Sequence, residues 1–108
     1  MLFPPDKVVV SIYNVITWKN LTVHCKDKHH DLGTHVLQYG GNYKFSFKPN
    51  FFARVTLYFC RFSWEGGSHS FDIYDEDRDD CSLCVWNVLE SGPCMHYAKY
   101  DECFAWKH

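Results

Sequence analysis

Hydrophobic and polar residues alternate along several short segments of this chain. In residues 43–48 aromatic side chains alternate with polar ones, and in residues 21–25 apolar side chains alternate with Thr22 and His24. A period of two is that of a β-strand with one face in a core and the other in water. Both segments are therefore predicted to be strands.

Further predicted strands and turns indicate the fold class. Residues 55–62 are apolar on nearly both faces, which is typical of a central strand covered on each side. Gly40-Gly41-Asn42 and Gly66-Gly67-Ser68 lie between apolar runs and supply the positive φ that tight turns need. No segment of ten or more residues has a convincing helical period. Further strands are expected at residues 8–13, 69–74 and 84–89, with short pieces near Val36 and Phe104. About eight short strands at this spacing predict an all-β fold, a small antiparallel β-sandwich.

Length and charge narrow the function classes. The chain has 108 residues, of which 46% are hydrophobic, and this is enough for one core but leaves no room for a second domain. We therefore expect a single domain over residues 1–108. A formal charge of −2 argues against binding to nucleic acid, which needs clustered Lys and Arg. No apolar run approaches the roughly 18 residues that cross a bilayer, so we expect no membrane insertion.

The cysteine content predicts a secreted protein. An even number of cysteines in so short a chain is typical of extracellular domains held by disulfides, because a small core alone stabilises a fold weakly. Cys94 and Cys103 bracket a short segment after Gly92-Pro93 and are expected to pair as a hairpin-like staple. The other four cysteines leave three possible connectivities. The six positions are Cys25, Cys60, Cys81, Cys84, Cys94 and Cys103.

Two other cysteine chemistries fit the spacing less well. Cys81 and Cys84 form a Cys-x-x-Cys pair that suits a zinc knuckle, but Cys94 and Cys103 are separated by eight residues, and Cys84 opens an apolar strand. The βαβ context of a thioredoxin-like redox pair is missing. Structural disulfides without a metal or other cofactor are the favoured interpretation.

One modification signal supports secretion. Asn20-Leu21-Thr22 is an acceptor sequon for N-linked glycosylation. Asn20 is therefore a candidate glycosylation site.

Short motifs follow one another along most of the chain. They are Thr22-Val23-His24-Cys25-Lys26, Asp31-Leu32-Gly33, Phe47-Lys48-Pro49-Asn50-Phe51, Leu57-Tyr58-Phe59-Cys60, Phe71-Asp72-Ile73-Tyr74, Arg78-Asp79, Cys81-Ser82-Leu83-Cys84-Val85-Trp86, Gly92-Pro93-Cys94 and Tyr100-Asp101-Glu102-Cys103-Phe104-Ala105-Trp106. No single motif is specific, but the ordered set resembles the plant self-incompatibility S-protein homologues, the family of poppy stigma S-proteins. The resemblance covers roughly residues 8–106.

This resemblance implies a secreted plant β-sandwich that acts as a signalling ligand. The founding members are ligands for a membrane protein on pollen, so the expected partner is a membrane receptor or another cell-surface protein, bound by a monomer. A secreted defence or effector protein is the alternative, and a secreted hydrolase ranks third. The chain has seven histidines but no recognisable catalytic motif around them, and His24 is interpreted as a hydrogen-bonded structural residue. We therefore expect no enzymatic activity.

Two charged loops are the candidate partner-binding sites, because exposed loops on a rigid sandwich usually carry binding specificity. The second loop is acidic enough to suggest calcium, but it lacks the spaced Asp and central Gly of an EF-hand and is more typical of a solvated connection. The candidate residues are Lys26, Asp27, Lys28, His29 and His30 in the first loop, and Asp75, Glu76, Asp77, Arg78, Asp79 and Asp80 in the second.

Overall fold

The computed structural model describes residues 7–49 and 56–106. Within these residues the chain forms strands and turns, and no helix is long and apolar enough to cross a membrane. The strands are β1 (Val8–Asn14), β2 (Leu21–Lys26), β3 (Asp31–Leu37), β4 (Asn42–Phe47), β5 (Leu57–Trp64), β6 (Gly67–Asp75), β7 (Leu83–Leu89), β8 (Gly92–His96) and β9 (Asp101–Cys103).

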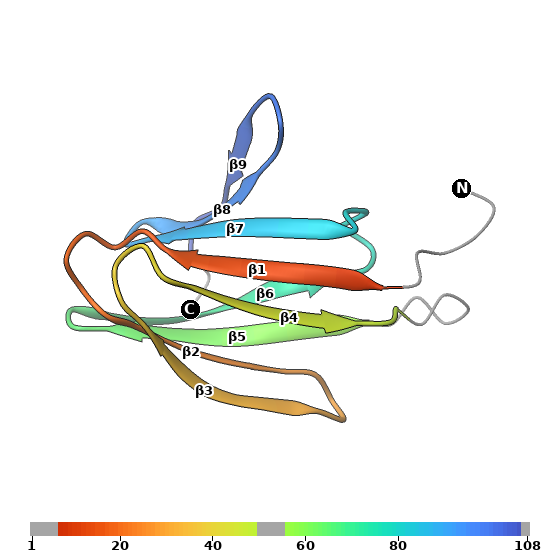
Figure 1. Ribbon diagram of the computed structural model, residues 1–108, viewed down its shortest axis with the longest axis horizontal. Helices are drawn as coiled ribbons and strands as arrows, with labels where there is room; N and C mark the ends of the chain where they lie inside the picture. The colour runs from red at the N-terminus through yellow and green to blue at the C-terminus, as the bar shows by residue number, and fades with distance from the viewer. Residues whose placement is uncertain (1–6, 50–55, 107–108) are drawn as a thin grey trace.

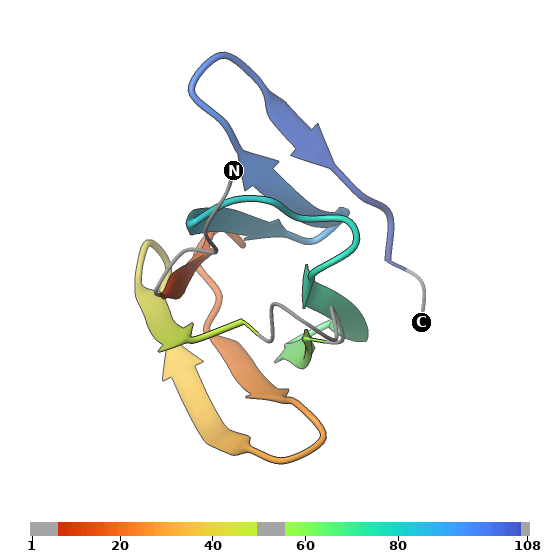
Figure 2. The same ribbon diagram turned by 90° about the vertical axis from the view of Figure 1, so that its right-hand side faces the viewer.

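The strands form two stacked sheets (Figure 1). One sheet has the order β4-β1-β7-β8-β9 and the other β3-β2-β5-β6. Figure 2 shows the β8–β9 hairpin extending away from the stack on one side and the β2–β3 hairpin on the opposite side. The all-β sandwich expected from the sequence is confirmed, with nine strands in the described residues where about eight were expected.

One pairing differs from a purely antiparallel sandwich. β1 is antiparallel to β4 but parallel to β7, with Val10 opposite Cys84 and Ile12 opposite Trp86. A parallel pair needs a long connection between its strands, and here that connection contains the whole second sheet. Alternation within a strand does not report the direction of its neighbour, so the sequence pattern could not show this pair.

The core lies between the two sheets and is built from the inward residues of both. In β2 the apolar residues Leu21, Val23 and Cys25 are fully buried, as their alternation predicts. Trp86 is fully buried on β7 and packs against Phe71 of β6, with their ring centroids 5.4 Å apart. Burying one such side chain contributes roughly 1.5–3 kcal/mol, so these contacts hold the sheets together.

The expectation that residues 55–62 form a strand covered on both faces is wrong for β5. It is central in its sheet, between β2 and β6, but only one of its faces meets the core. Leu57 and Phe59 point outward and remain 40% and 38% exposed. A two-layer sandwich has no third layer to cover this face. The first residue of the expected strand, Val55, lies outside the described residues.

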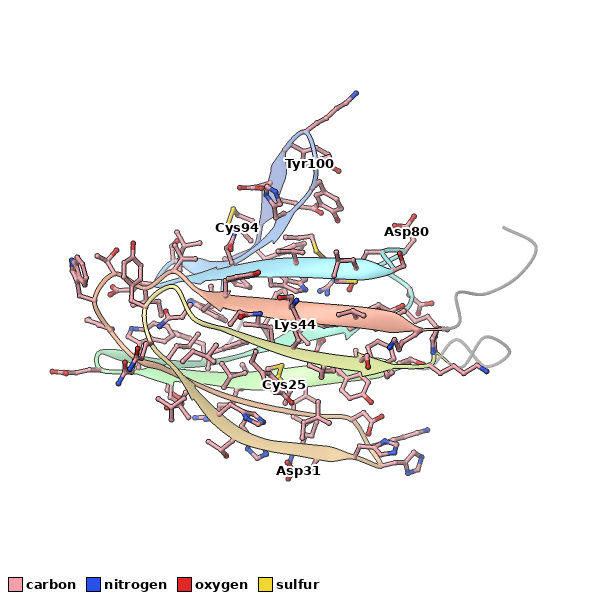
Figure 3. The ribbon with its side chains drawn as sticks, in the orientation of Figure 1. Cys25, Asp31, Lys44, Asp80, Cys94 and Tyr100 are labelled. Carbon is pink, nitrogen blue, oxygen red and sulfur yellow. A yellow bond between two sulfur atoms is a disulfide. The ribbon has the colours of Figure 1, made fainter. Side chains whose placement is uncertain are left out.

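Three disulfides use all six cysteines. Cys25 of β2 and Cys60 of β5 are paired residues on adjacent strands and are fully buried. Cys94 of β8 joins Cys103 of β9 at the base of the projecting hairpin, which is the pair that the sequence favours (Figure 3). The remaining bond closes the short segment that leads into β7, between Cys81 and Cys84.

Candidate recognition surface

Both candidate loops lie at the same end of the sandwich. β2 and β6 run toward this end, and β5, which lies between them and is antiparallel to both, begins there. Two interstrand spacings, about 10 Å, therefore separate the points at which the loops leave the sheet. Figure 1 shows that they then diverge, since the second loop crosses to the other sheet to reach β7.

The first loop is a tight turn organised by Asp27. Its carboxylate accepts hydrogen bonds from the backbone N–H groups of His29, at 2.9 Å, and His30, and its own N–H donates to the His30 carbonyl at 2.9 Å. This local network satisfies the turn's backbone and directs Lys28 and His29 into solvent. Asp27 is therefore a structural residue of the loop, whereas Lys28 and His29 are available to a partner.

Asp27 also connects the turn to the core. Burial tends to raise the pKa of its carboxyl group, but the bonds from the His29 and His30 N–H groups and the nearby His30 ring outweigh burial and leave the pKa below its usual value. The Tyr58 hydroxyl donates a hydrogen bond to the same carboxylate, and burial together with this negative charge raises the pKa of Tyr58 to about 12. Tyr58 is only 5% exposed, so this bond ties the loop to β5.

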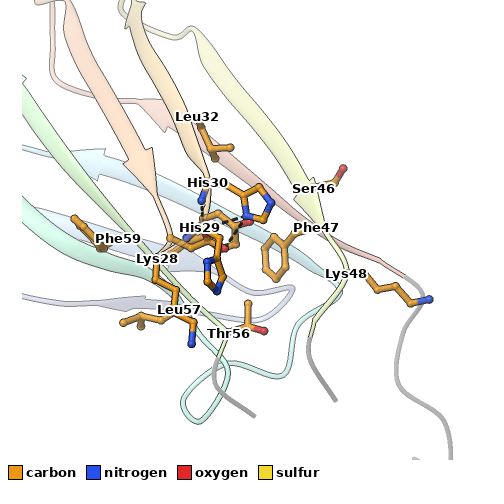
Figure 4. Close-up of a pocket in the computed structure, with 12 residues that line it drawn as sticks. Lys28, His29, His30, Leu32, Ser46, Phe47, Lys48, Thr56, Leu57 and Phe59 are labelled. Carbon is orange, nitrogen blue, oxygen red and sulfur yellow. Dashed lines mark hydrogen bonds and ion pairs between the residues drawn. The ribbon is translucent and has the colours of Figure 1, made fainter. Parts of the chain in front are cut away.

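A groove of about 660 Å³ opens beside this turn (Figure 4). Its walls come from the β2–β3 turn, the end of β4 and the start of β5. Aromatic and aliphatic side chains form its apolar part, while lysines and histidines supply basic groups around it. The lining residues are Asp27, Lys28, His29, His30, Leu32, Ser46, Phe47, Lys48, Thr56, Leu57, Tyr58 and Phe59.

The charge of this groove is mainly basic. Lys28 and Lys48 are exposed, and the ammonium of Lys26 lies 5.5 Å from the centre of the Phe59 ring, which places a third cation at its border. The carboxylate of Asp27 is occupied by the backbone and Tyr58 contacts described above. Apolar surface surrounded by cations is suited to an acidic chain segment that carries an apolar or aromatic side chain.

The second loop is largely structural, contrary to the appearance of its acidic sequence. Arg78 donates from Nε and Nη2 to the carboxylate of Asp79, each at 2.8 Å, and also to the Asp72 carbonyl at 2.8 Å. Its guanidinium lies 5.2 to 5.4 Å from the ring centres of Phe71, Trp86 and Phe104. Such stacking on aromatic faces is a favourable cation–π arrangement.

Asp79 continues this network into the backbone. It is 8% exposed, and its Oδ2 accepts a hydrogen bond from the Asp75 N–H at 3.0 Å. Asp75 in turn accepts from the Asp77 N–H through its side chain, and the backbone N–H of Glu76 donates to the Thr56 carbonyl. Asp77 and Asp80 are the carboxylates of this loop that stay exposed.

His24 lies outside the groove, on the outer face of β2. Its Nε2 is 2.6 Å from the Asp31 carboxylate. The Gly33 N–H and the His24 ring both bond to this carboxylate and lower the pKa of Asp31. The register of β2 and β3 shifts here, and Gly33 adopts a φ of 79°, a conformation that favours glycine. The hydrogen bond expected for His24 is present in the structure.

Sequence reasoning found one side of the groove and missed the other. The Lys26 to His30 loop was identified from its charge, whereas Phe47, Leu57 and Phe59 looked like ordinary core residues of predicted strands. The exposure of Leu57 and Phe59 depends on the two-layer architecture, which no local pattern reports. Phe47 is half-buried and does pack against the core. An apolar outer face on β5 was the available signal, and it suggested a covered strand.

A two-sheet β-sandwich closed by three disulfides belongs to the class of small extracellular domains, in which covalent cross-links supplement a limited core. The model of the family described as plant self-incompatibility protein S1 matches residues 9–106. The chain belongs to this family.

Individual relatives agree with the family assignment. S-protein homolog 5 of Arabidopsis thaliana is 45% identical over 101 residues, which cover 92% of this chain and 77% of that protein. S-protein homolog 2 of the same plant is 42% identical over 116 residues, which cover 97% of this chain and 71% of the relative.

A solved structure shares the fold. It is described as a self-incompatibility protein homologue from a widespread family of small, highly stable, secreted plant proteins. The superposition has a TM-score of 0.70 at 15% sequence identity. It covers 95% of this chain and 96% of the solved chain. The family is secreted, so this chain is an extracellular plant protein.

Proposed function

We propose that this protein is a signalling ligand that binds the extracellular part of a membrane receptor through the basic groove between the β2–β3 turn and the start of β5. The observation that carries this proposal is the groove itself, in which exposed Leu57 and Phe59 lie close to Lys28 and Lys48. Exposed apolar surface of this kind is costly in water and marks an interaction site more often than a solvated loop. Membership of the self-incompatibility S-protein family supports a receptor as the partner.

The partner's binding segment is acidic and carries at least one large apolar side chain. The apolar side chain fills the groove against Phe47 and Phe59, while carboxylates on the receptor meet Lys28 and Lys48 at its border. Affinity is expected to reside in the buried apolar contact, and the charges mainly raise the association rate and select the partner. The protein acts by binding, as a monomer, and without chemical turnover.

The decisive experiment measures saturable binding of the labelled, disulfide-intact protein to cells of the plant that produces it. Lys28→Glu combined with Lys48→Glu reverses both exposed charges that line the groove. The matched control is Lys44→Glu combined with Lys99→Glu, which makes the same charge change on the outer face of β4 and in the β8–β9 hairpin. The groove variant should lose at least tenfold in affinity, while the control should keep wild-type binding.

Three results would overturn the proposal. Binding that never saturates would exclude a receptor, and equal losses in the two double variants would show only a general charge effect. Saturable binding to microbial cells without plant cells present would instead favour a defence protein.

A further inference from the structure

An exposed aromatic pair lies at the end of the sandwich opposite to the groove. Trp18, in the β1–β2 turn, is 85% exposed, and Tyr39, which follows β3, is 44% exposed. Their ring centroids are 5.3 Å apart with an angle of 58° between the planes, so Tyr39 covers only part of the indole. β2 begins at this end and finishes at the groove, and Figure 1 shows the two ends far apart.

The exposure of Trp18 is fixed by the backbone. Among the described residues it is the one non-glycine residue with a positive φ, of 62°. This left-handed conformation costs an L-residue about 1–2 kcal/mol, so it persists only where its surroundings impose it. The Lys19 N–H closes the turn by donating to the Ile16 carbonyl at 3.2 Å.

Asn14 holds this turn from inside. It is fully buried, its Oδ1 accepts a hydrogen bond from the Ile16 N–H at 2.9 Å, and its Nδ2 donates to the carbonyls of Lys19 and Leu37 at 2.8 and 3.0 Å. Removing such a buried hydrogen-bonding group is costly, so the turn has little freedom to turn the indole inward. Trp18 is thus presented to solvent in a fixed position.

The residues after Trp18 alternate between the protein body and solvent. The Lys19 ammonium donates to the Glu65 carbonyl at 2.9 Å and lies 3.2 Å from the Glu90 carboxylate, and Leu21 is fully buried. Asn20, between them, is exposed. Trp18 and Asn20 are therefore both exposed, and two residues of chain place their Cα atoms at most about 7 Å apart.

Asn20 is the acceptor of the Asn20-Leu21-Thr22 sequon, the one such triplet in the sequence. We propose that Asn20 carries an N-linked glycan and that its first N-acetylglucosamine packs on the exposed face of the Trp18 indole. The negative face of an aromatic ring attracts the polarised C–H groups on the face of a sugar. Attachment two residues away holds the sugar at a high effective concentration next to the ring.

The attachment uses the ordinary chemistry of the secretory pathway, with a lipid-linked oligosaccharide diphosphate as the donor. The Asn20 Nδ2 forms a bond to C1 of the first N-acetylglucosamine, and the bond between C1 and the diphosphate oxygen breaks. The lipid diphosphate leaves with the electron pair of that bond, and one amide proton passes to a base of the transferase. The glycan then covers the indole that the fold leaves exposed.

A comparison of six proteins, in three pairs, tests this packing. The protein is secreted from a eukaryotic host and trimmed enzymatically to one N-acetylglucosamine, and its thermal midpoint is compared with that of Asn20→Gln. The same pair is prepared with Trp18→Ala, and a control pair with Tyr100→Ala, which removes a 61% exposed aromatic from the β8–β9 hairpin. The single sugar should raise the midpoint by about 4 °C or more in the wild-type and Tyr100→Ala backgrounds. Without Trp18 the gain should fall below about 1 °C.

Nuclear magnetic resonance adds a direct readout, because protons above an indole ring are shifted upfield. The sugar protons should show this shift in the wild-type protein and lose it in Trp18→Ala. An unoccupied Asn20 in the mass spectrum of the secreted protein would overturn the proposal. A stability gain of equal size without Trp18 would also overturn it. Loss of cell binding in unglycosylated Trp18→Ala, with no sugar-dependent stabilisation, would assign the indole to a protein partner instead.

Discussion

Arg78 and Asp79 are adjacent in sequence and joined by two hydrogen bonds, in which Nε and Nη2 of the guanidinium each lie 2.8 Å from a carboxylate oxygen. The Asp79 side chain is 4% exposed and that of Arg78 is 27% exposed, so the carboxylate is largely removed from water while the guanidinium remains partly solvated. The pair anchors the β6–β7 connection against the rings of Phe71 and Trp86. A loop that looks solvated in the sequence is therefore fixed at its centre.

Replacing Arg78 by Met should lower the free energy of unfolding by about 3–5 kcal/mol, because it leaves the buried Asp79 carboxylate without its counter-charge. Urea denaturation followed by tryptophan fluorescence measures this loss. Asp77→Asn is the control in the same loop, since Asp77 is exposed and should change stability by less than about 0.5 kcal/mol. Equal effects of the two substitutions would contradict an anchoring role.

Removing the Cys25–Cys60 disulfide should destabilise the protein more than removing Cys94–Cys103. The first bond links residues separated by 35 positions and the second links residues separated by 9. In the chain-entropy model the Cys25–Cys60 bond stabilises the fold by about 4 kcal/mol and the Cys94–Cys103 bond by about 3 kcal/mol. Replacing Cys25 and Cys60 by alanine also creates a cavity in the core. Thermal unfolding of the two paired alanine variants gives the ranking, and the reverse order would contradict it.

Stability should fall in acid partly through Asp27. Its pKa is below the ordinary value of 3.8 in the folded protein, so its contribution is complete above that pH and is lost as the pH decreases through the folded pKa. Between pH 5 and pH 2 the unfolding free energy of Asp27→Asn should therefore decrease less steeply than that of the wild type. Asp80→Asn removes one carboxylate outside this turn, and identical pH slopes for the two variants would exclude a special role for Asp27.

Tyr58→Phe tests the link between the β2–β3 turn and the core. Loss of its hydrogen bond to Asp27 should cost about 1 kcal/mol at neutral pH. Because the pKa of Tyr58 is raised to about 12, its contribution is complete below pH 10 and decreases as the pH rises through 12. The variant should therefore lose less stability in alkali than the wild type. Tyr100→Phe, at a 61% exposed site, is the control, and an equal change there would contradict the proposed link.

The sequence predicted those features of the fold that are encoded locally. Alternation placed β2 and β4 correctly, since the burial of Val23 and Phe45 follows from the period of their own strands. It could not show that β1 lies parallel to β7, or that Phe59 faces solvent, because both depend on residues distant in sequence. The same limit applies to Arg78, whose guanidinium lies against the rings of Phe71, Trp86 and Phe104 from three other segments.

The parallel pairing of β1 with β7 has a consequence for how the protein is made. β1 leaves the ribosome before the other described strands, yet one of its two neighbours, β7, follows about 70 residues later. The other sheet, with β2, β3, β5 and β6, can assemble and oxidise Cys25 and Cys60 while the first strand still lacks that neighbour. Pairings so distant in sequence form slowly, so completion of the sheet that contains β1 waits until β7 has been synthesised. Chains that stop before residue 83 should be retained by quality control even though half of the sandwich is already built.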